Sequence, residues 1–318
     1  MATKNIPAED IPAQDTSARD ALEARDALEA RERDLTELIR VAVPERSIRA
    51  DMRAVSIVWR RELIRFRTDR LRAVTSLVQP FLFLFVLGNG LGRLASHGLP
   101  AGVDFETFIY PGVLAMSVLF TAIFSAASIV WDREFGFLRE MLVAPVRRWA
   151  IVIGKCLGGA TVATFQGLIF LALAGVAHVP YSPTLLLTLV GELLLLSFTL
   201  TAFGVMMAAR IKQIQAFMAL TQLLVLPLFF LSGALYPLNG LPAWLTVLTR
   251  IDPLTYIVDP MRHAVFAHLS VSPLALKALS PGVTWDGWLV PLGLSVAMVA
   301  AIGFVMLAIA IAEFRKTE

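Results

Sequence analysis

Six long apolar segments constrain the fold of this chain more than any other feature. Crossing the hydrocarbon core of a bilayer, about 30 Å thick, takes about 20 mostly apolar helical residues. Six segments meet this requirement, at about 73–91, 108–131, 151–176, 184–209, 214–235 and 287–311. Since backbone polar groups in lipid must be satisfied internally, each segment is predicted to be a helix, with local kinks at Pro80 and Pro227. Such long continuous runs do not fit the short alternating segments of a β-barrel.

The composition excludes an ordinary soluble enzyme. Of the 318 residues, 57% are hydrophobic and only 17% are charged, and the mean hydropathy is +0.71. Soluble domains carry about 25% charged residues. The single cysteine, Cys156, rules out an intramolecular disulfide framework. We therefore predict an all-α membrane protein with six transmembrane helices.

The distribution of basic residues predicts the orientation of these helices. Nineteen basic residues lie in the segments 40–72, 132–155, 210–212 and 315–316, whereas the alternate connections hold four, namely Arg93, Arg250, Arg262 and Lys277. Connections rich in arginine and lysine remain on the cytoplasmic side. Both termini are therefore predicted to be cytoplasmic, in a multi-pass protein of the plasma (inner) membrane.

The first 45 residues differ from the rest of the chain. They are rich in acidic residues, and the hexapeptide ARDALE occurs twice, at 18–23 and 24–29. Few apolar anchors accompany these charges, which favours a solvated, intermittently helical cytoplasmic arm. A partner-binding coiled coil is the alternative, although it would have only Leu22 and Leu28 as anchors.

Residues 46–72 are predicted to form an amphipathic elbow helix before the first span. Ten arginines and no lysine occur in 40–72, beside an apolar stripe at Met52, Val55, Trp59, Leu63 and Phe66. An apolar stripe next to a cationic face suits a helix in the membrane interface, where arginines reach lipid phosphates. Packing against protein is the alternative. The adjoining span argues against nucleic acid as a partner of these arginines.

Two connections are longer than a chain reversal requires. The inner one, from Trp131 to Lys155, predicts a short charged amphipathic helix between Gly136 and Pro145. Such a helix would suit docking to a cytosolic partner, whereas a plain reversal takes only a few residues. The outer connection, after the fifth span, is moderately apolar and is cut by prolines. Its stretches 242–250 and 255–268 are too short to span, so we predict short re-entrant or interfacial helices.

The motifs in these two connections resemble those of ABC transporter type-2 permeases. The inner motif is D-R-E-F-G-F-L-R-E-M-L-V-A-P-V followed by G-K at 154–155, and the outer one is L-S-G-A-L-Y-P-L, then L-P, then P-L-T-Y-x-V-D and Arg262. The resemblance covers roughly Arg46 to Arg315, with residues 73–315 as the transmembrane domain. It is closest to the daunorubicin/doxorubicin-resistance and Nod-factor-export permeases. Arg147 departs from the pattern, because many relatives carry a small polar residue there.

The resemblance implies how such a permease is driven. Two permease copies would pair with two cytosolic ATP-binding subunits, and ATP and Mg would be bound by those partners, with no cofactor on this chain. The ATPase-coupling helix would use Asp132, Arg133, Glu134, Gly136, Leu138, Glu140, Leu142, Pro145 and Arg148. The outer motif would use Gly233, Pro237, Pro253, Tyr256, Asp259 and Arg262. The chain is not predicted to be an enzyme, since Gly154-Lys155 is followed by Cys156 and preceded by Trp149 where a phosphate-binding loop would need glycine.

Glu192 is the one acid deep inside a predicted span, and such a group is by default a candidate functional residue. The alternative is that it lies near the membrane interface, protonated or hydrogen-bonded to a neighbouring helix. The four histidines have no metal-ligand spacing, so no metal site is predicted. The expected function is an ATP-driven exporter of an amphipathic or hydrophobic substrate such as a drug, lipid or glycolipid, with membrane lipids as surroundings. A glycan-exporting permease and an ATP-independent secondary transporter are the alternatives.

Overall fold

The computed structural model describes residues 24–31, 47–95, 103–136, 146–269, 271–285 and 287–316. The chain divides into two units, Met1–Glu45 and Arg46–Glu318. In the first unit, residues 24–31 are helical, and Arg25 Nε lies 3.4 Å from Glu29 Oε1. This ion pair joins positions i and i+4 of the second hexapeptide, as helical spacing requires.

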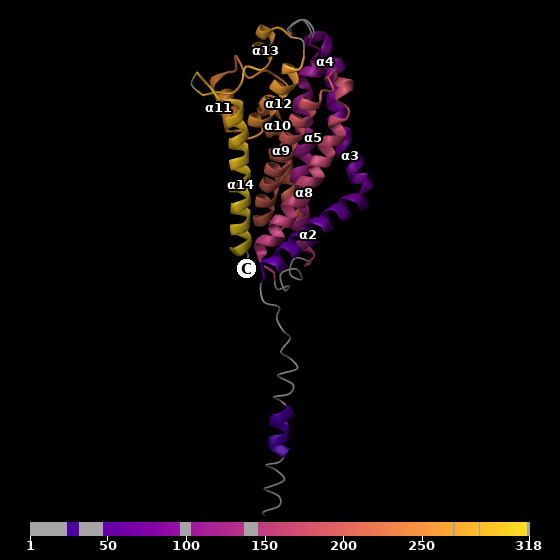
Figure 1. Ribbon diagram of the computed structural model, residues 1–318, viewed down its shortest axis with the longest axis vertical. Helices are drawn as coiled ribbons and strands as arrows, with labels where there is room; N and C mark the ends of the chain where they lie inside the picture. The colour runs from indigo at the N-terminus through magenta and orange to yellow at the C-terminus, as the bar shows by residue number, and fades with distance from the viewer. Residues whose placement is uncertain are drawn as a thin grey trace, which may run out of the picture. The chain divides into compact units, whose positions relative to one another are not determined.

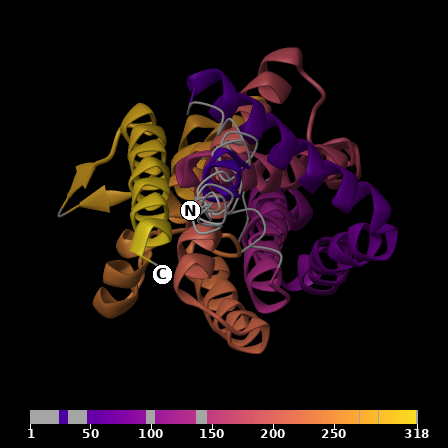
Figure 2. The ribbon, with the colours of Figure 1, turned by 90° about the horizontal axis from the view of Figure 1, so that it is seen from below.

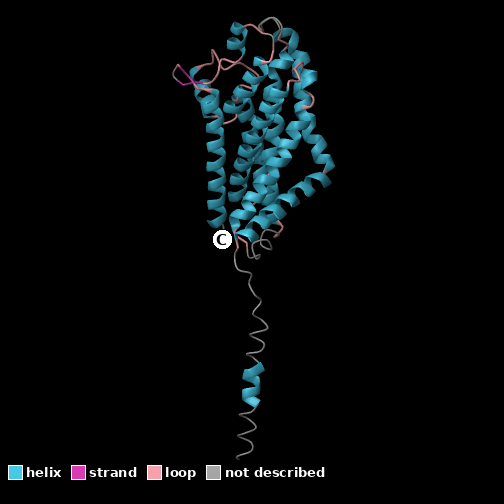
Figure 3. Ribbon diagram, in the orientation of Figure 1, coloured by secondary structure: helices cyan, strands magenta, loops and turns pink. Residues whose placement is uncertain are grey.

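In the described part of the second unit, the regular elements are helices and one two-stranded hairpin, joined by loops (Figure 3), which confirms the predicted fold class. Six stretches are long and apolar enough to cross a membrane, namely Ala73–Gly92, Phe105–Glu134, Arg148–Leu171, Pro183–Arg210, Ile214–Leu231 and Leu292–Lys316. The helices that form them are α3 (Arg70–Leu82) with η1 (Phe83–Leu87) and α4 (Gly88–Ala95), α5 (Phe105–Ser125) with α6 (Ala127–Glu134), α8 (Arg148–Leu171), α9 (Pro183–Arg210), α10 (Ile214–Leu231) and α14 (Leu292–Lys316) (Figure 1).

Pro80 and Pro227, at which local kinks were predicted, both lie inside helices. Pro80 lies inside α3, and the helix passes into the π-type turn η1 three residues later, which is a common response to a lost backbone N–H. By contrast, α10 remains helical through Pro227.

The third span ends earlier than predicted, and the sixth begins later. The third ends at Leu171 rather than near 176, because the chain then forms the short 3-10 helix η2 (Ala174–Ala177) and turns at His178, whose φ is 56°. The sixth was predicted from 287 but begins at Leu292. The preceding residues form a hairpin of β1 (Thr284–Trp285) and β2 (Trp288–Leu289), which turns at Gly287 with φ of 87°.

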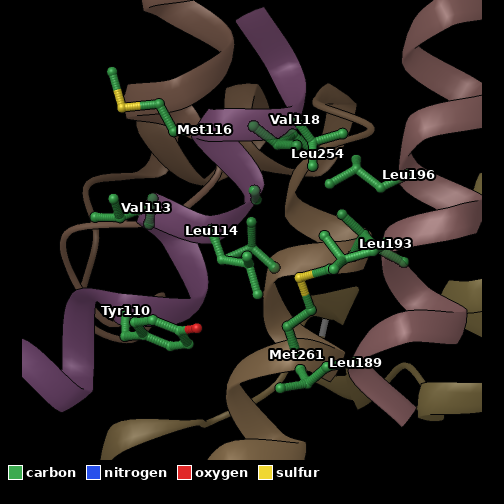
Figure 4. Close-up of a cluster of buried hydrophobic side chains, with 14 of the residues drawn as sticks. Tyr110, Val113, Leu114, Met116, Val118, Leu189, Leu193, Leu196, Leu254 and Met261 are labelled. Atoms are coloured by element: carbon green, nitrogen blue, oxygen red, sulfur yellow. The ribbon is translucent and has the colours of Figure 1, made fainter. Parts of the chain in front are cut away.

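The helix α5 forms the centre of the core. Its residues 107–119 are all buried, and it packs against α3, α8, α9 and α10. Figure 4 shows its apolar side chains, with those of α9 and Met261, in one cluster, whose labelled members include Leu114, Val118, Leu193 and Leu196.

The outer connection forms α11 (Ala243–Ile251), α12 (Thr255–Ala267) and α13 (Pro273–Leu279). The helix α12 is buried over most of its length and packs against α5, α9 and α14, as a re-entrant helix would. In α11, by contrast, the apolar side chains Trp244, Val247, Leu248 and Ile251 are exposed along one stripe, which suits an interfacial helix.

The elbow α2 (Ile48–Thr68) packs lengthwise against α8. Figure 2, from below, shows α2 and α3 on one side of the bundle and α14 on the opposite side. A Cβ added at Gly154 or Gly158 of α8 would lie only 2.8 Å from Val58 Cβ or 2.6 Å from Glu62 Cβ, so these glycines permit the close approach. The buried residues of α2 are Asp51, Val58 and Glu62, while Met52 of the predicted apolar stripe is exposed. The elbow therefore faces α8 with two acids.

Candidate functional site

Lys155 of α8 lies at the centre of a buried ionic cluster. Its Nζ is 2.6 Å from Glu62 Oε1 of α2 and 2.6 Å from Asp132 Oδ2 of α6. It also donates a hydrogen bond to Ser128 Oγ, at 3.1 Å. Lys155, Glu62 and Asp132 are only 4%, 7% and 3% exposed. Each charge is therefore held by opposite charges rather than by water, and α2, α6 and α8 are joined at one point.

Arginines of α2 extend this cluster toward the surface. The Arg61 guanidinium donates to Asp132 Oδ1 at 3.0 Å, and an Arg65 nitrogen lies 3.9 Å from the same oxygen. Arg65 also lies over the ring of Trp131, 5.1 Å from its centroid. We call Glu62, Asp132, Lys155 and Arg61 the inner ionic cluster, because it lies at the inner end of the bundle, where α6 ends and α8 begins.

The charged residues that follow Asp132 bind the ends of other helices. Arg133 donates to the carbonyl oxygens of Ala208, Ala209 and Ile211 at the end of α9, at 2.6–3.1 Å. The Glu134 carboxylate accepts the backbone N–H of Ile214, the first residue of α10, at 3.0 Å. These groups satisfy helix-end carbonyls and an N–H that lack partners within their own helices.

Arg147 and Arg148, at the start of α8, also contact neighbouring helices. Arg148 donates to the carbonyls of Phe314 and Arg315 at the end of α14, both at 3.2 Å. The Arg147 backbone N–H donates to Asp51 Oδ1 of α2 at 3.0 Å, and its side chain lies 3.5 Å from Asp51 Oδ2. Arg147, the departure from the family pattern, is thus fixed to the elbow.

The structure places five of the nine predicted coupling residues, Asp132, Arg133, Glu134, Gly136 and Arg148. Four of them bind other helices, and Gly136 follows α6 with φ of 84°. Leu138, Glu140, Leu142 and Pro145 lie outside the described residues. We call residues 132–148, which are predicted to couple to an ATP-binding subunit, the coupling segment. Charged side chains at its first end contact α2, α8, α9 and α10. Those at its last end contact α2 and α14.

Sequence reasoning missed the elbow's contribution to this site. Asp51 and Glu62 were passed over among the arginines, although their eleven-residue spacing is three helical turns and places both on one face. Lys155 was counted only as a basic loop residue and as part of the G-K motif.

A cavity of about 460 Å³ adjoins the inner ionic cluster and lies among α2, α3, α5, α6, α8 and α10. Its volume falls in the range of small-molecule sites, about 300–1,000 Å³. Its apolar wall includes four aromatic side chains, Phe66, Phe120, Phe124 and Trp131. Glu62 lines the wall next to the cluster, so the same carboxylate contacts Lys155 and the cavity.

The polar wall of this cavity is rich in uncharged groups. Three glutamines contribute, Gln79, Gln166 and Gln222, together with five hydroxyl side chains. The Gln166 Oε1 accepts from Thr121 Oγ1 at 2.7 Å and from Ser76 Oγ at 3.0 Å. Gln166 therefore both joins α3, α5 and α8 and faces the cavity.

Glu192 is buried in α9 and is not among the residues that line the cavity. Its Oε2 has no hydrogen-bond partner among the described residues. Its role stays a prediction.

The outer motif is organised around Arg262 of α12. This side chain is fully buried and lies over the ring of Phe108, 4.4 Å from its centroid. It donates to the carbonyls of Gly233 and Ala234 at 2.6 and 3.0 Å, with a longer bond of 3.4 Å to Tyr236. Gly233 has φ of 72°, a conformation that glycine adopts at little cost. Arg262 thus fixes the turn after α10.

The remaining outer-motif residues lie around the same turn. Tyr256 donates to the Arg250 carbonyl at 2.8 Å and accepts from Trp285 Nε1 at 3.0 Å. Burial raises the pKa of Asp259, an effect that nearby Arg262 partly offsets. For Arg262, burial disfavours the charged guanidinium and lowers its pKa to about 10. Pro253 lies between α11 and α12, and Pro237 lies in the loop after α10. These outer-motif residues form a packed cap, and none of them is among the residues that line the cavity.

Comparison with known proteins identifies the family. Residues 53–266, more than half of the chain, match the family described as "ABC-2 type transporter". The chain belongs to this family. It is therefore a multi-pass permease subunit of an exporter, a domain without ATPase activity that works with an ATP-binding subunit.

Three curated relatives illustrate the similarity. The chain is 28% identical over 217 residues to "Putative transport permease ycf38" of Cyanophora paradoxa, which covers 67% of this chain and 74% of the relative. It is 30% identical over 217 residues to "Nodulation protein J" of Rhizobium leguminosarum bv. trifolii, covering 66% and 80%. It is 32% identical over 160 residues to "Probable multidrug ABC transporter permease YbhR" of Escherichia coli K12, covering 49% and 43%. A particular closeness to daunorubicin-resistance permeases stays a prediction.

Proposed function

We propose that this chain moves an amphipathic or hydrophobic substrate (a drug, lipid or glycolipid) outward across the plasma membrane. Two copies would form the permease, and two cytosolic ATP-binding subunits would drive it by hydrolysing Mg-ATP. The coupling segment would be the part of this chain that contacts those subunits.

The observation that carries the proposal is the attachment of the coupling segment to the bundle. Asp132 shares Lys155 with Glu62 of the elbow, while Arg133, Glu134 and Arg148 bind the ends of α9, α10 and α14. A displacement of this segment by a partner would therefore move several spans together. Charged hydrogen bonds to helix ends are short and directional, which suits the transmission of such a movement.

Two alternatives concern the cargo and the energy source. A glycan-exporting permease would use the same coupling but a different substrate. An ATP-independent secondary transporter would have its ion pairs near the substrate at mid-membrane. The inner ionic cluster instead adjoins the coupling segment, which favours the ATP-driven mechanism.

Co-expression with candidate ATP-binding subunits tests the proposal. We expect one of them to co-purify with the chain and to support ATP-dependent export. Gly136→Val, which strains the φ of 84° at the end of α6, should reduce export, whereas Gly191→Val, at an open position of α9, should not. If no ATP-binding subunit associates and Gly136→Val leaves export intact, the proposal fails.

A further inference from the structure

We propose that the cavity that adjoins the inner ionic cluster binds an amphipath whose head group is uncharged and carries hydroxyl or amide groups. The inference rests on the proposed function, since it names the class of substrate and a binding site for it within one copy of the permease.

An unpartnered hydrogen-bonding group on a residue of the cavity wall points to such a ligand. Gln166 is only 1% exposed, and its Nε2 has no hydrogen-bond partner among the described residues, although it lines the cavity. A buried amide N–H without a partner costs free energy that a ligand acceptor would recover. Exchanging the nitrogen and oxygen of this amide would leave a free carbonyl instead. A hydroxyl or an amide satisfies both arrangements, because it donates and accepts.

The charges around the cavity disfavour a charged head group. Glu62, the acid of the buried wall, is already paired with Lys155 at 2.6 Å. Arg65 lies over Trp131 and near Asp132, and Asp69 has interactions of its own. A charged ligand group would therefore enter without a free counter-charge and would lose its hydration.

The apolar part of the ligand has a matching surface. Four aromatic rings line the cavity, and flat rings accommodate both acyl chains and the apolar faces of sugars. The flanking helices α3 and α10 both pack against α5, and each exposes an amide at the cavity wall, Gln79 and Gln222. Exposed amides within two spans are costly in lipid, and a head group passing between these helices would satisfy them.

The chain offers a convenient local readout, because its only cysteine, Cys156, is 1% exposed. In the full chain with Cys156→Ala, the substitution Gln222→Cys introduces one thiol at the cavity wall. Its rate of reaction with N-ethylmaleimide is measured in lipid nanodiscs with three probes of equal chain length: octyl β-glucoside, octyl sulfate and octyltrimethylammonium. Gln215→Cys, exposed on α10 outside the cavity, is the matched control.

We expect octyl β-glucoside to protect the Gln222→Cys thiol at a concentration about tenfold lower than either charged probe, and to leave the Gln215→Cys thiol unprotected. Adding Gln166→Leu should raise the protecting concentration about tenfold, the loss of one hydrogen bond. If that variant does not fold, Gln79→Leu at an exposed position should raise it about threefold.

Three results would overturn the inference. These are equal protection by all three probes, a labelling rate that depends on protein concentration rather than on any probe, and unchanged protection in the folded glutamine variant. The second result would mean that another copy of the chain covers the thiol. The assay uses neither ATP nor a partner, so its failure would leave the proposed ATP-driven export standing, and failed export would leave the binding result intact.

Discussion

Replacing Lys155 should destabilise the protein strongly, because its buried ammonium pairs with two buried carboxylates. In Lys155→Met, Glu62 loses its 2.6 Å partner, whereas Asp132 keeps the Arg61 guanidinium at 3.0 Å. Breaking a buried ion pair by removing one partner costs about 3–5 kcal/mol, because the other charge stays buried. With one carboxylate stranded, we expect a loss of about 3 kcal/mol in the free energy of unfolding.

The double variant Glu62→Gln with Lys155→Met removes the stranded charge and should recover about 2 kcal/mol of this loss. Reversible unfolding in mixed detergent micelles, followed by circular dichroism, gives these free energies. Lys212→Met, at an exposed position between α9 and α10, is the matched control and should change stability by less than about 0.5 kcal/mol. The reasoning is refuted if Lys155→Met behaves like Lys212→Met, or if the double variant is no more stable than Lys155→Met alone.

Three further predictions concern other parts of the molecule. Burial raises the pKa of Asp252 to about 8, although a hydrogen bond from the Leu254 N–H lowers it. The neutral carboxyl therefore stabilises the folded protein, and this contribution is fully present below pH 3.8 and is lost as the pH rises through about 8. The thermal midpoint should therefore fall from pH 5 to 8 more in wild type than in Asp252→Asn; equal slopes would contradict this. Arg262→Met strands the carbonyls of the outer turn and should cost about 2–4 kcal/mol in the same unfolding assay, and a loss below about 1 kcal/mol would be inconsistent with the described bonds. Gly158→Ala places a Cβ 2.6 Å from Glu62 Cβ and should cost about 1–3 kcal/mol, whereas Gly191→Ala meets open space and should stabilise by up to about 1 kcal/mol; equal effects would argue against the close packing of α2 on α8.

The span count and the all-helical class were predictable because each span has its own local signal. A run of about 20 apolar residues is fixed by bilayer thickness and needs no information about neighbours. The ends of the third and sixth spans were less predictable, because turns decide them. His178 adopts a left-handed conformation, and the Trp285–Trp288 pairing depends on the positive φ of Gly287.

The candidate site was only partly predictable for a different reason. Asp132, Arg133 and Glu134 were selected from their motif, but their partners lie 23 to 80 residues away in the chain. Such pairings follow from helix packing, which a single sequence does not reveal. The same limit applies to Gln166: the sequence marks it as one of several polar residues in the third span, but only its contacts with α3 and α5 place it at the cavity.

The most direct test of the account compares transport with ATP hydrolysis in proteoliposomes that contain the chain and a co-purifying ATP-binding subunit. Fluorescent amphipaths report outward movement, and phosphate release reports hydrolysis. We expect wild type to move an amphipath only with hydrolysable ATP. The variant Asp132→Asn, which weakens the tie between the coupling segment and Lys155, should keep hydrolysis but lose at least about tenfold in transport. Transport without ATP, or unchanged transport in folded Asp132→Asn, would contradict the central claim that the coupling segment links ATP hydrolysis on the partner subunits to transport.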